Sequence, residues 1–275
     1  MTRMAEAKAA AVACWTADPC GAVEGEPGTE DYTRRLVRAR RGYAPWMDTV
    51  LDYSGASDLD VLDVGCGQGV DLIRYAQAGA RVTGLDLTPR HVALARAHLG
   101  ALNLPGVVVE GDAEEMPFAD SSFDRVSSNG VLHHTPDFQK ALAEIERVLR
   151  PHGEVRVILY NRRSLHYWLW QVLYEGVAKG GLRRERSMPA VLSAGVERTS
   201  IGARPLVRVY SPREVANRMK RAGFGEVTTV VRHFSWGDIP YGQLIERFTP
   251  FTSSSLQERI GQICGWYVTG MGRKR

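Results

Sequence analysis

A glycine-rich turn between an apolar strand and a helix constrains this chain more than any other feature of its sequence. Residues 60–64 are predicted to form a short buried strand, and Gly65, Gly67 and Gly69 follow it, directly before a predicted helix over 70–77. Glycines in such a turn let a ligand approach the backbone closely, and the first N–H groups of the helix are free to bind it. The turn is typical of α/β folds that bind nucleotide-like ligands at the carboxyl ends of their strands.

Strands and helices then alternate along the middle of the chain. Further strands are predicted at 81–87, 107–110, 123–128 and 154–160, and again at 226–234 and 266–271. Short loops between alternating strands and helices indicate a mostly parallel sheet with helices on both faces, a doubly wound α/β fold. Helix starts are predicted at Thr88-Pro89, at Thr135-Pro136 and at the capping box Ser211–Glu214.

Breaks in this alternation divide the chain into six segments. We expect a helical N-terminal cap (1–56), a ligand-binding core (57–160), a helical insertion (161–205), a continuation of the core (206–234), a second insertion (235–262) and a last core strand with a tail (263–275). Both insertions leave from carboxyl ends of strands, so we expect both to cover the cleft, with the N-terminal helices as a third wall. Their aromatic side chains either line an apolar pocket or hold the cap on the core: Tyr167, Trp168, Trp170, Tyr174, Trp236 and Tyr241.

Composition narrows the classes of function. The chain has 275 residues and a net charge of +4, without the basic stripe of a nucleic-acid-binding protein. No apolar run approaches the roughly 18 residues that a membrane span needs. The four cysteines have no metal-binding spacing, and the apolar stretch before Cys14 is too short for a signal peptide. We therefore expect no metal, reduced thiols and a cytoplasmic location; the oligomeric state is not predicted.

An acid at the end of the second strand indicates an adenosine-containing ligand. Asp86 follows Gly65 by 21 residues, where dinucleotide folds place the carboxylate that binds ribose hydroxyls. The glycine spacing is G-x-G-x-G rather than the G-x-G-x-x-G of nicotinamide- and flavin-binding proteins. Two further polar segments end neighbouring strands, Gly111-Asp112-Ala113 and 129–134.

Five ordered motifs together resemble the class I S-adenosylmethionine-dependent methyltransferases, and most closely their ubiquinone/menaquinone C-methyltransferase-like branch. They are VLDVGCGQG (61–69), TGLDLT (83–88), GDAEEMPF (111–118), SFDRVSSNGVLHH (122–134) and RVLRPHGEVRV (147–157). The resemblance implies a seven-stranded Rossmann-like sheet of order 3-2-1-4-5-7-6, with strand 7 antiparallel. It also implies S-adenosyl-L-methionine as the methyl donor, with S-adenosyl-L-homocysteine as the product. The stretch Trp15–Gly21 resembles a segment found in some bacterial members.

The resemblance assigns roles to individual positions of the cofactor site. Gly65, Gly67 and Gly69 would face the methionine moiety, with Cys66 packed between them; Asp86 would hold the ribose and Leu87 would pack on the adenine. Asp112 would bind the adenine amino group, and the backbone of Ala113 a ring nitrogen. Asn129 would line the methionine end, and Asp63 would organise the glycine turn.

The sulfonium donor is already activated, so the enzyme mainly has to align a nucleophile with the methyl group. The candidates for a general base are His133 and His134, which follow the fourth strand, and either could instead be scaffold. Tyr160, at the end of the fifth strand, is a further candidate, either as a catalytic phenol or as a wall of the cleft.

The function that these patterns favour is methyl transfer to a small-molecule acceptor at carbon, oxygen or nitrogen, with an acceptor that is partly apolar or aromatic. A macromolecule-directed methyltransferase and a non-methylating S-adenosylmethionine-binding cyclase or regulator are the alternatives, because a fold does not fix a function. The basic turn Arg183–Arg186 is either a solvated surface or, with the aromatic helix before it, a contact for a membrane surface or an acidic substrate.

Overall fold

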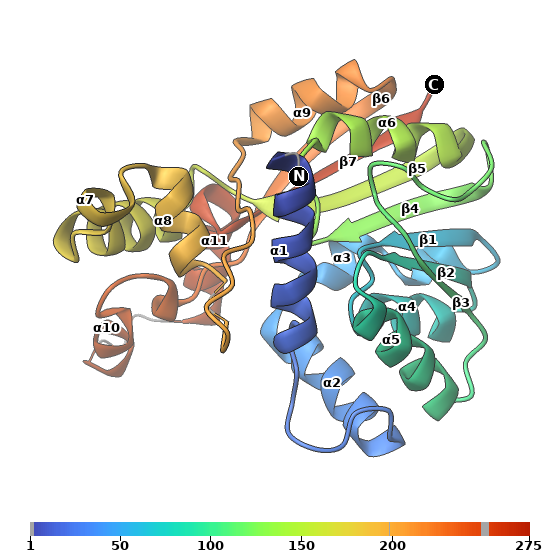
Figure 1. The fold of residues 1–275 in the computed structure, drawn as a ribbon, viewed down its shortest axis with the longest axis horizontal. Coiled ribbons are helices and arrows are strands. Elements are labelled where there is room, and N and C mark those ends of the chain that lie inside the picture. Colours follow the sequence, from blue (N-terminus) through green and yellow to red (C-terminus); the bar gives the residue numbers. More distant parts are fainter. Residues whose placement is uncertain (1–2, 198, 249–252) are drawn as a thin grey trace.

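A seven-stranded sheet forms the centre of the computed structural model, which describes residues 3–197, 199–248 and 253–275 (Figure 1). The strands are β1 (Asp60–Val64), β2 (Arg81–Asp86), β3 (Val107–Glu110), β4 (Phe123–Asn129), β5 (Leu149–Tyr160), β6 (Phe224–Arg232) and β7 (Tyr267–Lys274). Their order is β3-β2-β1-β4-β5-β7-β6, and β7 runs antiparallel to both β5 and β6. The predicted fold class, strand order and antiparallel last strand are confirmed.

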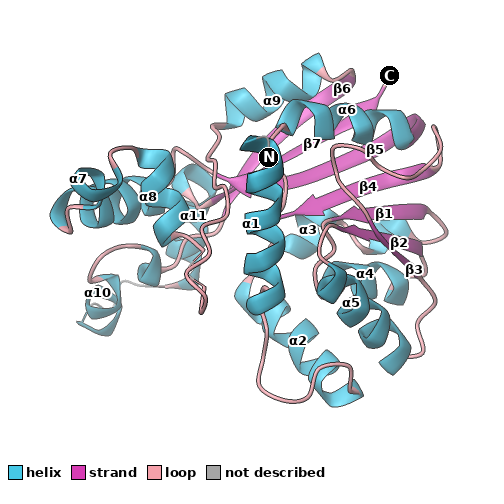
Figure 2. Ribbon diagram, in the orientation of Figure 1, coloured by secondary structure: helices cyan, strands magenta, loops and turns pink. Residues whose placement is uncertain are grey.

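Helices cover both faces of the sheet, because consecutive strand residues point to opposite sides. Val61 and Val82 pack with the helices α3 (Met47–Leu51), α4 (Val70–Gln77) and α5 (Pro89–Ala101). Their neighbours Leu62 and Leu85 pack on the other side with α6 (Phe138–Val148) and α9 (Pro212–Arg221). The result is a three-layer α/β/α core, shown by secondary structure in Figure 2. Strands buried on both faces are the reason that their sequences are apolar runs rather than alternating patterns.

The N-terminal segment and the two insertions lie around the carboxyl ends of the parallel strands. Helix α1 (Arg3–Ala17) crosses these ends, between the sheet and a helical lobe, and α2 (Glu30–Tyr43) follows it (Figure 1). The lobe contains the π-helix η2 (His166–Ala178), α7 (Gly181–Glu185), α8 (Met188–Gly195), the short η3 (Trp236–Asp238), α10 (Gly242–Phe248) and α11 (Ser254–Cys264). Among the described residues, no helix combines the length and the apolar character that crossing a membrane requires.

Two local predictions need correction. Helix α6 is capped by Asp137, whose carboxylate accepts hydrogen bonds from the N–H groups of Gln139 and Lys140, and not by Thr135. Strand β5 begins at Leu149, five residues before the predicted start at Glu154. The additional residues are accommodated by a register shift against β4, between Phe123 and Arg125. The other predicted strands are displaced by at most three residues at their ends.

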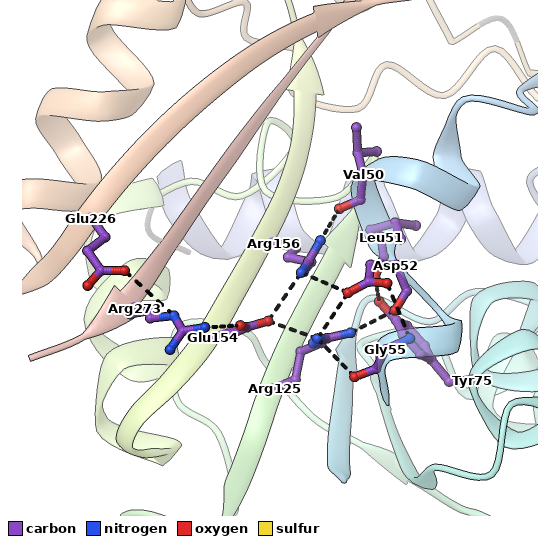
Figure 3. A network of polar contacts seen from close by, with 10 residues as sticks. All are labelled: Val50, Leu51, Asp52, Gly55, Tyr75, Arg125, Glu154, Arg156, Glu226 and Arg273. Carbon is purple, nitrogen blue, oxygen red and sulfur yellow. Dashed lines mark hydrogen bonds and ion pairs between the residues drawn. The ribbon is translucent and has the colours of Figure 1, made fainter. Parts of the chain in front are cut away.

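A network of ion pairs connects the sheet to the segment after α3 (Figure 3). It lies toward the end of the sheet where the parallel strands begin. The buried Arg125 guanidinium on β4 lies 2.8 Å from Glu154 Oε2 on β5 and donates to the Asp52 carbonyl at 2.8 Å. Arg156 donates to the same Glu154 carboxylate at 3.2 Å, and Arg273 on β7 donates to its other oxygen at 2.8 Å. Each charge in this network is therefore matched by a protein group of opposite charge or by a carbonyl.

Candidate functional site

A cavity of about 510 Å³ opens where the carboxyl ends of the parallel strands meet α1 and α2. Eight of the ten predicted cofactor residues line it: Gly65, Cys66, Gly67, Asp86, Leu87, Asp112, Ala113 and Asn129. The tertiary structure thus brings together residues from the ends of four strands, as ligand sites in open α/β sheets require. The volume of the cavity suits a drug-sized or cofactor-sized ligand.

The glycine turn is held by the end of β2. The Gly65 and Cys66 N–H groups donate to the Leu85 carbonyl at 2.6 and 3.1 Å, and Gly67 N–H donates to Asp86 Oδ2 at 2.8 Å. Gly67 has φ +54°, and a Cβ placed there would project into open space within the cavity lining. Because Gly67 has no side chain, its backbone borders the cavity directly. A larger residue here would occupy part of the space for a ligand.

Gly69 differs from the other two glycines, contrary to the prediction that all three face the ligand. It caps α4 with φ +84°, and a Cβ there would lie 3.1 Å from the side chain of Ala95 on α5. It does not line the cavity. Gly69 is thus required for close helix packing rather than for contact with a ligand.

Asp86 combines a role in the turn with exposure to the cavity. Its carboxylate accepts hydrogen bonds from Gly67 N–H at 2.8 Å and Thr88 N–H at 2.9 Å, and Oδ1 lies 3.3 Å from His91 Nδ1. Each carboxylate oxygen can accept more than one hydrogen bond. The remaining capacity is available to hydroxyl groups in the cavity, as the ribose prediction requires.

Asp112 and Ala113 form the wall that the sequence assigns to adenine, and a lysine shares this wall. Lys8 on α1 donates to Asp112 Oδ2 at 2.5 Å and to the buried Glu114 at 2.6 Å, and these two carboxylates raise the pKa of Lys8 against the opposing effect of its burial. Asp112 Oδ1 accepts the Glu114 N–H at 2.8 Å. The Lys8 ion pairs fix α1 over the end of β3.

Opposite charges surround the part of the cavity next to the glycine turn. Asp71 at the start of α4 accepts hydrogen bonds from Tyr53 at 2.6 Å and from the Asn129 amide at 2.9 Å. Arg40 on α2 approaches the same carboxylate to 3.9 Å, which is too far for a direct hydrogen bond. Asp71 is the main cause that raises the pKa of Arg40 against the effect of its burial. The pair presents a cation and an anion to one ligand.

Asp63, which was predicted to organise the glycine turn, bonds to a residue of the neighbouring strand β4. It lies beneath the cavity and accepts a hydrogen bond from the Ser127 hydroxyl of β4 at 3.0 Å. Burial, and next the charge of Asp71, raise its pKa well above the usual range. Its role within this structure is to join β1 to β4.

The two histidines after β4 have different environments. His134 lines the cavity, and its Nδ1 lies 2.7 Å from the Leu206 carbonyl. His133 is fully buried behind it, and its ring is tilted against that of Tyr160 with centroids 3.9 Å apart. Among the described residues neither of its ring nitrogens has a hydrogen-bond partner. Burial lowers the pKa of both rings, and that of His133 strongly. Of the two candidates for a general base, only His134 can therefore reach a ligand in the cavity.

Tyr160 lines the cavity next to His134 and is held by a residue that the sequence did not single out. Its hydroxyl donates to Glu197 Oε1 at 2.5 Å, and its ring stacks on Trp266 with centroids 4.4 Å apart. Burial, and next the charge of Glu197, raise its pKa well above 10. Tyr160 is thus a neutral hydrogen-bond donor rather than a phenolate at neutral pH.

The insertions contribute less to the cavity than predicted. From the described residues of 161–205 the cavity lining includes Glu197 alone, and from those of 235–262 it includes no residue. The aromatic residues named for the pocket pack against one another, as Trp170 does on Tyr174, or are exposed, as Trp168 and Tyr241 are. The aromatic lining comes instead from four other residues: Trp15, Tyr43, Tyr160 and Tyr267.

Several cavity residues escaped the sequence analysis, and most of them come from the N-terminal segment. Lys8, Trp15 and Arg40 carry no spacing relative to the glycine motif, and the one available signal was the stretch Trp15–Gly21. Gln68, inside the motif, explains how that segment is anchored: it donates to the Cys20 carbonyl at 2.9 Å and accepts from the Tyr32 hydroxyl at 3.1 Å. In the described part of the chain no group of three His, Cys, Asp or Glu side chains could hold a metal ion.

Comparison with known proteins agrees with this geometry. Residues 62–157 match a family model described as a methyltransferase domain. The chain is 35% identical over 126 residues to a ubiquinone biosynthesis O-methyltransferase from Pseudomonas paraeruginosa, covering 44% of this chain and 52% of that protein. It is 38% identical over 155 residues to phthiotriol/phenolphthiotriol dimycocerosates methyltransferase 1 from Mycobacterium ulcerans, covering 54% of each. The chain thus spans about half the length of these curated relatives.

The fold is also shared with solved structures. An S-adenosylmethionine-dependent methyltransferase from Aquifex aeolicus superposes with a TM-score of 0.54 at 17% identity, covering 92% of this chain and all of that one. At this identity the likeness concerns the arrangement of the sheet and helices. The match to the family model, by contrast, covers the segment that carries the glycine turn and the carboxyl ends of β1 to β4.

Proposed function

We propose that this chain, which carries a class I S-adenosyl-L-methionine-dependent methyltransferase domain, transfers a methyl group from that donor to a small-molecule acceptor. The observation that carries the proposal is the single cavity lining formed by the glycine turn, Asp86, Asp112 and the Arg40–Asp71 pair. These groups match, in one continuous surface, the parts of a molecule that joins adenine, ribose and an amino acid.

The amino-acid end of the donor fits the charges beside the glycine turn. A methionine moiety carries one carboxylate and one ammonium group, and Arg40 and Asp71 offer one charge of each sign. We assign the donor carboxylate to Arg40 and the ammonium group to Asp71, because each would gain a closer partner than the 3.9 Å that now separates them. Asn129, bonded to Asp71 at 2.9 Å, would orient that carboxylate.

The adenosine end fits the walls formed by β2 and β3. Asp86 would accept hydrogen bonds from the ribose hydroxyls, and Leu87 would cover one face of the adenine. Each Asp112 oxygen already accepts one hydrogen bond, from Lys8 or from the Glu114 N–H, and can accept another from the adenine amino group. The backbone of Ala113 would bond to a ring nitrogen of the adenine. These four assignments agree with the roles that the motif resemblance implies.

When bound, the donor supplies a methyl group on a positively charged sulfur, which needs no further activation. The chain's task is to align the acceptor atom with that methyl group and to exclude water. Trp15, Tyr160 and Tyr267 form an apolar wall suited to an acceptor that is partly apolar or aromatic. The names of the two relatives, one for ubiquinone biosynthesis and one for phthiotriol/phenolphthiotriol dimycocerosates, support a small-molecule acceptor of this character. The four cysteines are free thiols, which supports a cytoplasmic location.

Calorimetry and methyl transfer test this proposal. S-adenosylmethionine and S-adenosylhomocysteine should both bind the purified protein with one-to-one stoichiometry, whereas NAD should not. Incubation with donor labelled in the methyl group should then transfer label to apolar phenols, alcohols or amines of low molecular weight. Binding of NAD in place of the two sulfur compounds would overturn the assignment of the cavity.

A further inference from the structure

A carboxylate, an imidazole and a phenol meet at the end of the cavity away from the adenine wall. Glu197 lies just after α8, His134 after β4 and Tyr160 at the end of β5. Glu197 Oε1 accepts the Tyr160 hydroxyl at 2.5 Å and lies 3.8 Å from His134 Nε2. All three side chains are largely buried, and all three line the cavity. Neither donor binding nor the alignment of the acceptor requires Glu197.

The hydrogen bonding of His134 determines which of its ring nitrogens can act. Nδ1 lies 2.7 Å from the Leu206 carbonyl, which can only accept, so Nδ1 carries the hydrogen. In the neutral ring the lone pair is then on Nε2, on the side of Glu197. Trp15 on α1 packs edge-on against the ring at 5.5 Å, which restricts its rotation. The geometry leaves Nε2 as an acceptor that a ligand in the cavity can reach.

We propose that Glu197 is a positioning residue that keeps His134 ready to accept a proton from a hydroxyl acceptor, phenolic or enolic, as its oxygen is methylated. This inference rests on the proposed methyl transfer and adds to it a base, a partner for that base and a class of acceptor. Tyr160, by donating to Glu197, holds the carboxylate in place beside the imidazole.

The step balances with groups already named. The acceptor O–H bond breaks and its proton moves to His134 Nε2, while the oxygen forms a bond to the methyl carbon. The bond between that carbon and the donor sulfur breaks, and its electron pair stays on sulfur, which becomes the neutral thioether of S-adenosylhomocysteine. One positive charge is lost from sulfur and one is gained by the imidazole, where the Glu197 carboxylate at 3.8 Å stabilises it. The proton then passes to solvent.

The charge of Glu197 favours a hydroxyl over an amine as the acceptor. A carboxylate beside an amine stabilises the protonated ammonium form, which has no lone pair to attack with. Beside a neutral hydroxyl the same carboxylate stabilises the imidazolium that forms during the reaction. Both His134 Nε2 and Glu197 are acceptors, so the group placed between them must donate a hydrogen. A hydroxyl meets both conditions.

The charges around His134 set the direction of the pH dependence. Burial lowers its pKa, whereas the charge of Glu197 and the bond to Leu206 raise it. The other titratable groups nearby are His133, which is buried and neutral, Tyr160, a neutral phenol, and Cys14 on α1, whose pKa is raised to about 11 by burial and by Glu197. Removing the Glu197 charge should therefore lower the pKa of His134 further.

The decisive measurement needs no acceptor. The His134 imidazole is titrated by NMR in the S-adenosylhomocysteine complex of the wild type, of Glu197→Gln, and of Glu185→Gln as a control. Glu185 lies in the same insertion and pairs with Arg204 at a distance from the cavity lining. We expect the pKa of His134 to fall in Glu197→Gln and to be unchanged in Glu185→Gln. Equal His134 titration in all three proteins would overturn the proposal.

Turnover tests the acceptor class separately. Ring-matched pairs, such as 2-naphthol with 2-naphthylmethylamine, are offered with methyl-labelled donor, and the phenols should be methylated preferentially. Glu197→Gln should lower kcat by about 10-fold or more, with unchanged affinity for S-adenosylhomocysteine. Methylation of the amines and not of the phenols would overturn the acceptor class. A wild-type protein that binds no S-adenosylhomocysteine would contradict the proposed function itself, so the two failures are distinguishable.

Discussion

Two groups of buried and half-buried charges lie at opposite ends of the same sheet, and they are arranged differently. At the amino ends of the strands, Arg125, Glu154 and Arg156 bond directly to one another or to carbonyls at 2.8 to 3.2 Å (Figure 3). At the carboxyl ends, Arg40 and Asp71 are 3.9 Å apart across the wall of a 510 Å³ cavity.

The difference indicates what each group of charges does. A buried charge that is paired with another protein group costs stability when that group is removed, because the charge is then left without compensation away from water. A charge that faces a cavity without a close ion-pair partner retains interaction capacity for a ligand. Substitutions in the first group should therefore change stability, and those in the second should change affinity.

The largest effect is expected in the paired network. Glu154→Leu removes the carboxylate that lies 2.8 Å from the buried Arg125 guanidinium and leaves it only the Asp52 carboxylate at 3.4 Å, so the free energy of unfolding should fall by about 3–5 kcal/mol. Urea denaturation measures this, with Arg34→Leu as control, since the Arg34–Glu30 pair is exposed and worth at most about 1 kcal/mol. Equal stability of the two variants would remove the distinction between the ends of the sheet.

The next effect is expected at the cavity and concerns binding. Arg40→Leu should weaken S-adenosylmethionine and S-adenosylhomocysteine by about 2–5 kcal/mol, because the donor carboxylate would lose its cationic partner. 5′-Methylthioadenosine has the adenosine and the sulfur but lacks the amino acid, so its affinity should not change. Calorimetry with the three compounds checks this, and equal losses for all three would show that Arg40 shapes the cavity without binding the carboxylate.

Asp86→Ala sharpens the same contrast, with a somewhat smaller effect. All three compounds contain the ribose, so each should bind more weakly by about 1.5–3 kcal/mol. The pattern across the ligands, and not the size of the loss, distinguishes Asp86 from Arg40. Unchanged affinities in a folded Asp86→Ala protein would rule out the ribose assignment.

The smallest effect is expected at His133, which lies behind the cavity. Its two ring nitrogens have no hydrogen-bond partner in the described structure, and an unpaired buried polar group is costly. His133→Phe keeps an aromatic ring on Tyr160 and should raise the free energy of unfolding by about 1 kcal/mol without altering the acid limb of the pH–rate profile. Because burial lowers the pKa of His134, that limb should have its midpoint below pH 6.5 in both proteins. Loss of the limb in His133→Phe would reassign the base.

The sequence by itself determined the sheet, its order and most of the cavity lining that we assign to the donor, because these depend on local patterns. Apolar runs, helix caps and the 65–69 turn are each contained in a few neighbouring residues, and every parallel strand delivers its last residues to one edge. Eight of the predicted residues therefore line the cavity although up to 64 positions separate Gly65 from Asn129.

Only the tertiary structure decided what closes the cavity. Lys8 reaches Asp112 across 104 positions and Tyr160 reaches Glu197 across 37, and no periodicity or spacing links either pair. It also places three residues of the motifs outside the cavity lining: Gly69 packs on Ala95, Asp63 bonds to Ser127, and His133 lies behind His134. A strand or helix signal is local, whereas the direction of a side chain relative to a cavity depends on how separate segments pack together.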